Sequence, residues 1–204
     1  MNMRFVDLHC DTMGECIARS GGAVALRKND GHIDIEKLRA GGALAQFFAI
    51  FIPTHLEAER AGITGTPYDY FGLVYDAYLR EMETNRDFIA PAFNEGDILK
   101  NRDKGLISSI LTIEDGVPID GKMERIDEFY QKGVRLITLT WNYENSLAFP
   151  NSRDPEKMVL GLKPFGIDAV RRMNELGILV DVSHLSDGGF FDVARYSSKP
   201  FVAS

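Results

Sequence analysis

Short apolar runs alternate with amphipathic segments along the whole of this chain. Runs rich in Val, Ile, Leu and Phe are each followed by a stretch whose apolar residues recur every three or four positions. Parallel strands need a long crossover connection, which is usually a helix. The alternation therefore favours an α/β fold with a parallel sheet, and no shift in composition marks a boundary between domains.

The positions of the expected elements follow from these periods. Residues 68–86 have apolar side chains at helical spacing, whereas 44–52 is a continuous apolar run, as in a buried strand. Residues 141–163 have little periodicity, so we expect an irregular loop, and loops of this length usually serve a function. We expect further strands over 5–11, 106–113, 134–140, 178–183 and 201–203, and further helices from Thr12 and over 33–40, 94–102, 123–132, 164–176 and 187–196.

Composition excludes some classes of protein. The chain has 204 residues, 45% of them hydrophobic, which is enough for a substantial core in a single domain over 1–204. Its net charge of −7, from 23 basic and 30 acidic residues, argues against nucleic acid or an anionic membrane as the main partner. No apolar run approaches the roughly 20 residues that span a bilayer. A small molecule remains open as the ligand.

The cysteines and the N-terminus bear on location. Cys10 and Cys16 lie in one early segment and make no disulfide framework, which fits a reducing compartment. Residues 1–4 lead straight into the first expected strand, without the apolar region of a secretory signal. We therefore expect a cytoplasmic protein, with Cys10 as a small core residue.

Metal-competent side chains stand at the ends of three expected strands. If the first strand continues to Asp11, His9 and Asp11 point to the same side and can hold one metal ion. Glu114 ends the third expected strand, and His184 follows the fifth. The carboxyl ends of parallel strands form one face of an α/β fold, so these four side chains can converge although they are far apart in the chain.

Each candidate ligand also has a purely structural interpretation. The first pair can cap the strand and the helix that follows it. Glu114 can be a solvated residue before an Asp-Gly turn, and His184 can be a histidine at the edge of the core with a backbone hydrogen bond. The two other histidines, His32 and His55, are weaker candidates because neither has a second ligand at strand spacing.

Several motifs together resemble the membrane (renal) dipeptidase family of zinc peptidases. No one of them is decisive, but seven motifs in family order are a specific signal. They run from the first strand to the last residue: residues 7–11, His32 with 35–41, 46–48, 113–116, 133–140, 161–166 and 181–186.

The resemblance implies a (β/α)8 barrel of the TIM type, with two zinc ions at its carboxyl-end face. It implies that His9 and Asp11 hold one zinc ion. Glu114 would bridge both ions, and His184 would hold the second. Paired metal ions about 3.5–4 Å apart can activate one water between them. The family's activity would then be hydrolysis of the peptide bond of dipeptides through a metal-bridging hydroxide.

Two departures from the family pattern bear on this expectation. Better-studied members have a substrate-contacting histidine where this chain has Trp141, and an indole can pack against a substrate and donate one hydrogen bond but cannot shuttle a proton. Family sequences also continue past the position of Ser204, with another zinc histidine next. We therefore expect an N-terminal portion of the enzyme, a barrel truncated after about six strands, whose open edges favour self-association into a homo-oligomer.

Two other functions stay open. Fold and metal chemistry do not fix a substrate, so another metal-dependent amidohydrolase on the same kind of barrel is one alternative. The other is a catalytically silent binding or scaffold fragment, for which Trp141 and the expected truncation are the reasons.

Overall fold

Strand β4 (Ile107–Glu114) is shared by the two units into which the chain folds. The computed structural model describes residues 4–53, 55–60 and 62–204. One unit comprises Met1–Phe51 and Phe71–Thr112, and the other comprises Ile52–Tyr70 and Ile113–Ser204. Residues 1–3, which the sequence places before the first strand, lie outside the described residues.

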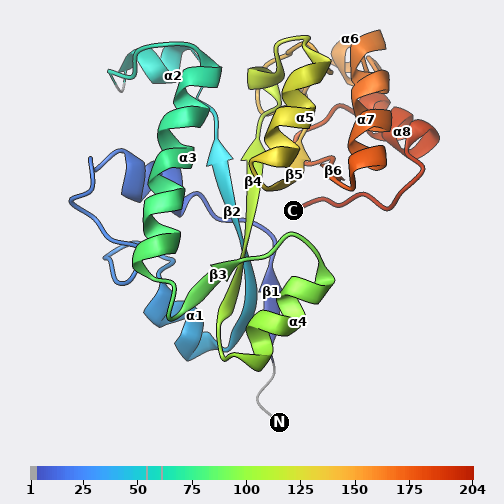
Figure 1. Ribbon diagram of the computed structural model, residues 1–204. Coiled ribbons are helices and arrows are strands. Elements are labelled where there is room, and N and C mark those ends of the chain that lie inside the picture. Colours follow the sequence, from blue (N-terminus) through green and yellow to red (C-terminus); the bar gives the residue numbers. More distant parts are fainter. Residues whose placement is uncertain (1–3, 54, 61) are drawn as a thin grey trace. The chain divides into compact units, whose positions relative to one another are not determined.

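The sheet of the first unit has parallel pairs of strands. β1 (Phe5–Asp7) pairs in parallel with β2 (Ala43–Phe51), and β3 (Ile89–Pro91) pairs in parallel with β4. β2 is the neighbour of β4 in this sheet (Figure 1). β2 is buried along most of its length because it is a nearly continuous apolar run. β4 is buried throughout, although half of its residues are polar or charged.

The first strand is shorter than the sequence predicts. β1 ends at Asp7, whereas a strand over 5–11 is expected. The segment nevertheless continues beside β2, since the amide of Cys10 donates to the carbonyl of Phe47 and the amide of Ala49 donates to the carbonyl of Cys10. A π-helix over Met13–Ala18 follows where a helix from Thr12 is expected.

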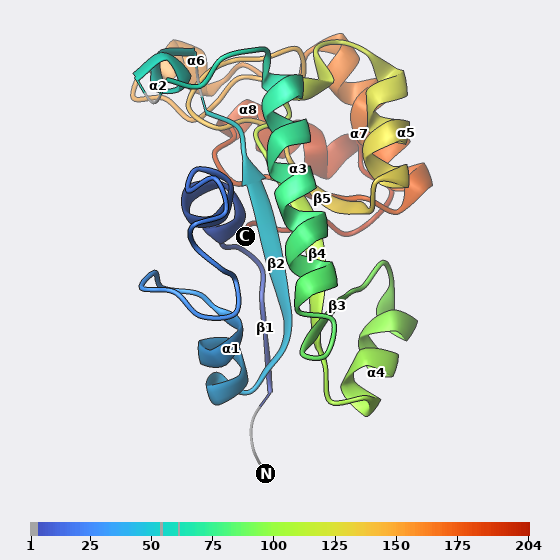
Figure 2. The same cartoon turned by 60° about the vertical axis from the view of Figure 1, so that its left-hand side comes forward.

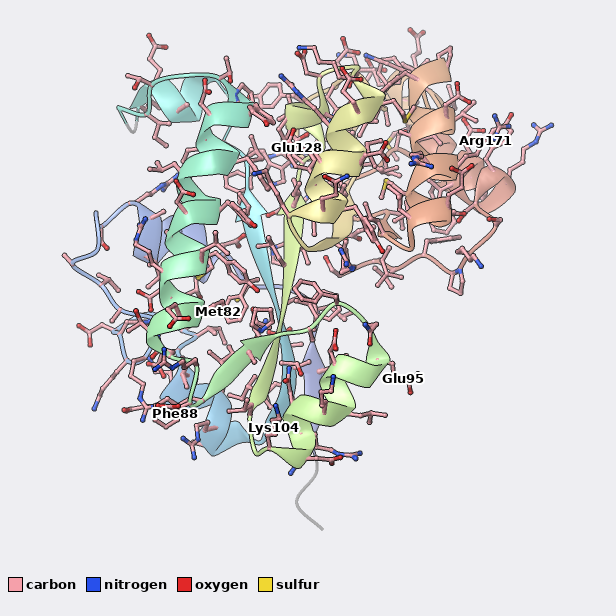
Figure 3. The ribbon with its side chains drawn as sticks, in the orientation of Figure 1. Met82, Phe88, Glu95, Lys104, Glu128 and Arg171 are labelled. Carbon is pink, nitrogen blue, oxygen red and sulfur yellow. The ribbon has the colours of Figure 1, made fainter. Side chains whose placement is uncertain are left out.

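Three helices of the expected ranges accompany these strands. They are α1 (Ile35–Gly41), α3 (Pro67–Thr84) and α4 (Glu95–Asp103). α3 lies along the sheet in both views (Figures 1 and 2), and the hydroxyl groups of Tyr78 and Ser109 join it to β4 at 2.9 Å. Phe88 follows α3 (Figure 3). The guanidinium carbon of Arg27 lies 3.4 Å from the centroid of its ring.

Asp34 is the N-cap of α1 and is buried. Its carboxylate accepts hydrogen bonds from the amides of Lys37, at 2.7 Å, and Asn29, at 3.1 Å, and the Lys37 ammonium lies 2.8 Å away. Burial acts to raise the pKa of Asp34, but the hydrogen bonds from Lys37 and Asn29 outweigh it and lower the pKa below its ordinary value.

Asp34→Ala should lower the free energy of unfolding by about 2 kcal/mol, because it removes a helix cap and leaves buried donors unpaired. Asp34→Asn keeps a capping oxygen and should cost less. Since the folded-state pKa is lowered, the charged carboxylate stabilises the fold above its unfolded pKa of about 3.9, and this contribution is lost as the pH falls below that value. Urea denaturation near neutral pH and at about pH 3 measures this. If the difference in free energy of unfolding between wild type and Asp34→Asn is the same at about pH 3 as at neutral pH, the carboxylate of Asp34 does not stabilise the fold through its charge.

The second unit contains β5 (Val134–Thr138) and β6 (Leu179–Asp181), which are parallel neighbours. Three helices of the expected ranges follow its strands: α5 (Met123–Gln131), α7 (Pro164–Leu176) and α8 (Asp187–Tyr196). α7 packs against both α5 and α8 (Figure 2). The strand expected over 201–203 is reduced to a parallel bridge between Val202 and Asp181. A short helix, α2 (His55–Arg60), is not apparent from sequence periodicity.

The segment 141–163 is largely irregular, as predicted, and contains one short helix, α6 (Pro155–Met158). Glycines let its backbone lie directly on α7 and α8. A β-carbon on Gly166 of α7 would lie 2.0 Å from the carbonyl oxygen of Leu147, and one on Gly188 of α8 would lie 2.4 Å from that of Val159. The loop is therefore docked onto the helices backbone to backbone.

The hydrophobicity of the helices and of β1 bears on possible partners. In the described part of the chain, no helix is both long and apolar enough to cross a membrane. β1 exposes the large apolar side chains of Phe5 and Val6. The expected self-association stays a prediction.

Candidate metal centre

His9 and Asp11 form one pair of candidate ligands, in the first unit. Nε2 of His9 lies 3.3 Å from Oδ1 of Asp11, and both side chains are partly exposed. Cys10, between them, is buried, as predicted for a small core residue. Burial raises the pKa of Cys10 to about 12, so its thiol is protonated at neutral pH in the metal-free protein.

Glu114 and His184 form the other pair, in the second unit. Glu114 is the last residue of β4 and His184 lies three residues past the end of β6. Their side chains meet with Nε2 of His184 3.3 Å from Oε1 of Glu114; 9% of the glutamate side chain is exposed and 39% of the histidine. The fold thus joins two predicted ligands that are far apart in the chain. The meeting of this pair with His9 and Asp11 stays a prediction.

His184 has a left-handed backbone conformation, with φ of 65°. It lies in a turn closed by a hydrogen bond from the amide of Leu185 to the carbonyl of Val182. A residue with a β-carbon pays about 1–3 kcal/mol in this region, and such a conformation persists only where the surroundings enforce it. Strain at a predicted metal ligand is typical of a functional position.

The long loop over 141–163 helps to hold His184 in this left-handed conformation. The amide of Asn151 donates to the carbonyl of His184 at 2.7 Å, and the amide of Ser186 donates to the carbonyl of Phe149 at 3.2 Å. The hydroxyl of Thr140 also donates to the His184 carbonyl, at 3.4 Å. Residues of the loop therefore fix the backbone on the C-terminal side of His184, at its carbonyl and at Ser186.

Trp141, the predicted substrate contact, lies beside His184. The centroids of the two rings are 6.4 Å apart, in an edge-to-face arrangement. The indole therefore forms a wall next to the candidate ligand. A direct contact between Trp141 and substrate stays a prediction.

Asp115 and Asn145 support the Glu114 side of the centre, and the sequence does not reveal their role. The Asn145 amide donates at 2.8 Å both to Oδ1 of Asp115 and to the carbonyl of Leu139, while its own oxygen accepts from the amide of Leu147. Burial raises the pKa of Asp115 to about 6, against the hydrogen bond from Asn145, which lowers it. Asn145 thus ties the turn after β4 to the loop after β5.

Of the other histidines and the second cysteine, the structure describes one side chain, that of His32. His32 is an exposed residue between the π-helix and α1. The side chains of His55 and Cys16 lie outside the described residues.

The donor set fits zinc. Imidazole nitrogen and carboxylate oxygen are two of the three ligand types that zinc takes from proteins, and each pair supplies one of each. Glu114 has a second carboxylate oxygen besides the one nearest to His184, so its chemistry suits a bridging position. The same donors also suit other divalent transition metals, for which imidazole and carboxylate are common ligands.

The chain is similar to known dipeptidases. A family model described as membrane dipeptidase, peptidase family M19, matches residues 1–204. The chain is 28% identical over 185 residues to an uncharacterized dipeptidase of Schizosaccharomyces pombe, in a match that covers 85% of this chain and 43% of the relative. It is 27% identical over 177 residues to dipeptidase tcpJ of Claviceps purpurea, covering 85% and 41%. The chain thus spans less than half the length of these curated relatives.

A solved structure shows the fold. A metallopeptidase from Rhodobacter sphaeroides, liganded with a phosphinate mimic of the dipeptide L-Ala-D-Ala, matches with a TM-score of 0.83 at 22% identity. The match covers 100% of this chain and 65% of that chain. It confirms the predicted class, an α/β fold of the barrel type with parallel strands.

Proposed function

The chain belongs to the membrane dipeptidase family, and from this membership we propose that it carries the metal-binding part of a zinc-dependent dipeptidase. The observation that carries the proposal is the meeting of Glu114 and His184, whose side chains lie 3.3 Å apart at the ends of two different strands. A buried carboxylate and a half-exposed imidazole at this distance are suited to share a dication. The substrate class follows from the family, so the proposed substrates are dipeptides.

We assign the ligands as the resemblance suggests. His9 and Asp11 would hold one ion, Glu114 would contribute to both, and His184 would hold the second. When bound, the metal pair supplies Lewis acidity and lowers the pKa of water toward about 7, which provides a nucleophile for the scissile carbonyl at neutral pH.

The chain's own residues hold the Glu114 carboxylate in place, shield it from bulk water and offer a surface to the substrate. Glu114 is held by the end of β4, where its backbone carbonyl also accepts a hydrogen bond from the amide of Ile52. Its burial keeps bulk water from the carboxylate, which strengthens its attraction for a cation. Trp141, edge-on to His184, offers an apolar surface for a side chain of the dipeptide.

Metal analysis and a peptide panel test this function. The protein, purified without chelator, should contain about one to two zinc ions per chain. With zinc it should hydrolyse L,L or L,D dipeptides but not N-acetylated ones, which lack a free amino group. Bound zinc with hydrolysis of other amides alone would favour the amidohydrolase alternative, and absence of both metal and hydrolysis would favour the silent scaffold.

A further inference from the structure

Asp181, the last residue of β6, has a fully buried carboxylate with an unusual number of donors around it. Oδ1 accepts from the amide and the hydroxyl of Ser183, at 3.0 and 2.8 Å, and from the amide of Ser204 at 3.2 Å. Oδ2 accepts from the hydroxyl of Thr138 at 2.6 Å and from that of Ser204 at 2.8 Å. An ionised carboxylate only accepts, and these donors use all of its roughly four lone-pair sites.

These hydrogen bonds join three segments around the turn that carries His184. Thr138 ends β5, Ser183 immediately precedes the histidine, and Ser204 follows the bridge at Val202. Ser183 is held through both its amide and its hydroxyl, so the peptide leading into His184 has little freedom. The left-handed conformation of His184 is thus fixed from one side by Asp181 and from the other by the loop.

We propose that Asp181 is a positioning residue for His184, which holds the strained turn in the conformation that directs the imidazole at Glu114. The expected effect on metal affinity rests on the proposed metal site. The positioning of His184 by Asp181 does not, because it involves only residues of the second unit. Groups that orient a metal ligand typically change metal affinity by about 10–100-fold when they are replaced. Asp181 is not itself a candidate ligand. It acts on His184 through the three segments that it joins around the turn, at Thr138, Ser183 and Ser204.

A matched control exists in the same unit. Asn174 of α7 is also buried, and its Oδ1 accepts from the amides of Ser198 and Lys199 and from the hydroxyls of Ser197 and Ser198. It therefore organises the segment after α8 as Asp181 organises the turn after β6. None of its partners is a candidate metal ligand. Loss of either group removes a buried acceptor, but only Asp181 is linked to His184.

The experiment compares Asp181→Asn with Asn174→Ala in the purified chain. Asp181→Asn keeps the acceptor toward Ser183 but places an amide opposite the hydroxyls of Thr138 and Ser204, so the fold should survive while the turn loosens. Zinc affinity is measured by chelator competition, and stability by urea denaturation of the metal-free protein. We expect Asp181→Asn to weaken zinc binding about 10–100-fold, and Asn174→Ala to lower the denaturation midpoint with zinc affinity changed by less than about twofold.

A second measurement keeps the two hypotheses apart. In the metal-free protein, the amide and imidazole NMR signals of His184 should shift in Asp181→Asn and stay in place in Asn174→Ala. Unchanged His184 signals in Asp181→Asn would overturn the positioning role. So would a loss of zinc affinity that is proportional to the loss of stability in both variants. If wild-type protein binds no zinc, the proposed function fails, and the NMR comparison still decides the role of Asp181.

Discussion

Gly166→Ala should lower the free energy of unfolding by about 3 kcal/mol or more, the upper end of what overpacking costs. The added methyl group would lie 2.0 Å from the carbonyl oxygen of Leu147 and 2.8 Å from its carbonyl carbon. Because the obstacle is backbone, no rotamer change can relieve it. Leu147 cannot retreat easily, since its amide donates to Asn145 and its carbonyl accepts from the amide of Lys163.

Gly72→Ala is the matched control. Gly72 also lies within a helix, α3, but a β-carbon there would meet nothing within 4 Å. The same substitution should therefore stabilise the protein by about 0.5–1 kcal/mol, because alanine favours helix. Urea denaturation of both variants measures the contrast. If Gly166→Ala proves as stable as wild type, the loop does not approach α7 as described.

Glu114→Gln should abolish hydrolysis, with kcat/KM reduced at least about a thousandfold, or about 4 kcal/mol of transition-state stabilisation. The amide has nearly the shape of the carboxylate and can still hydrogen-bond to His184, so the fold should be retained. It lacks the negative charge that the proposed bridging position needs, so zinc content should fall as well. Zinc analysis, activity on the best dipeptide and circular dichroism measure the three effects. Hydrolysis is measured in the longest product that the gene encodes, because the prediction concerns the full-length enzyme.

His32→Ala serves as the control for this experiment. His32 is exposed and belongs to neither candidate pair. Its replacement should leave zinc content and turnover unchanged. Turnover that survives in Glu114→Gln would remove Glu114 from the bridging position, and zinc lost from His32→Ala would show that the ligand set is wrong.

Elements with a local signal were predictable from the sequence. α1 ends at Gly41 and is capped by Gly42, whose φ of 82° is the left-handed conformation expected of a glycine there. α7 begins with Pro164 in its first turn. β3 and α2 have no such signal, because three to six residues are too few to show a period. The first strand ends early because apolar alternation continues in an extended segment that only partly keeps the ladder with β2.

The site divides in the same way. Glu114 and His184 could be predicted because each is a metal-competent residue at the end of an apolar run, and the structure brings this pair together. Asn145, Asp115 and Asp181 could not, because their roles depend on partners that lie about thirty to forty positions away in the chain. The sequence alone does not show that a polar side chain will be buried with its hydrogen bonds satisfied.

The glycines under the long loop have a consequence for engineering. The positions that must lack a side chain are the glycines of the helices. Most loop positions from 152 to 159 are exposed, and Val159 is 74% exposed. A library that randomises those exposed positions, with Gly166 and Gly188 kept, should yield many folded members. The loop could then be diversified without redesign of the scaffold beneath it.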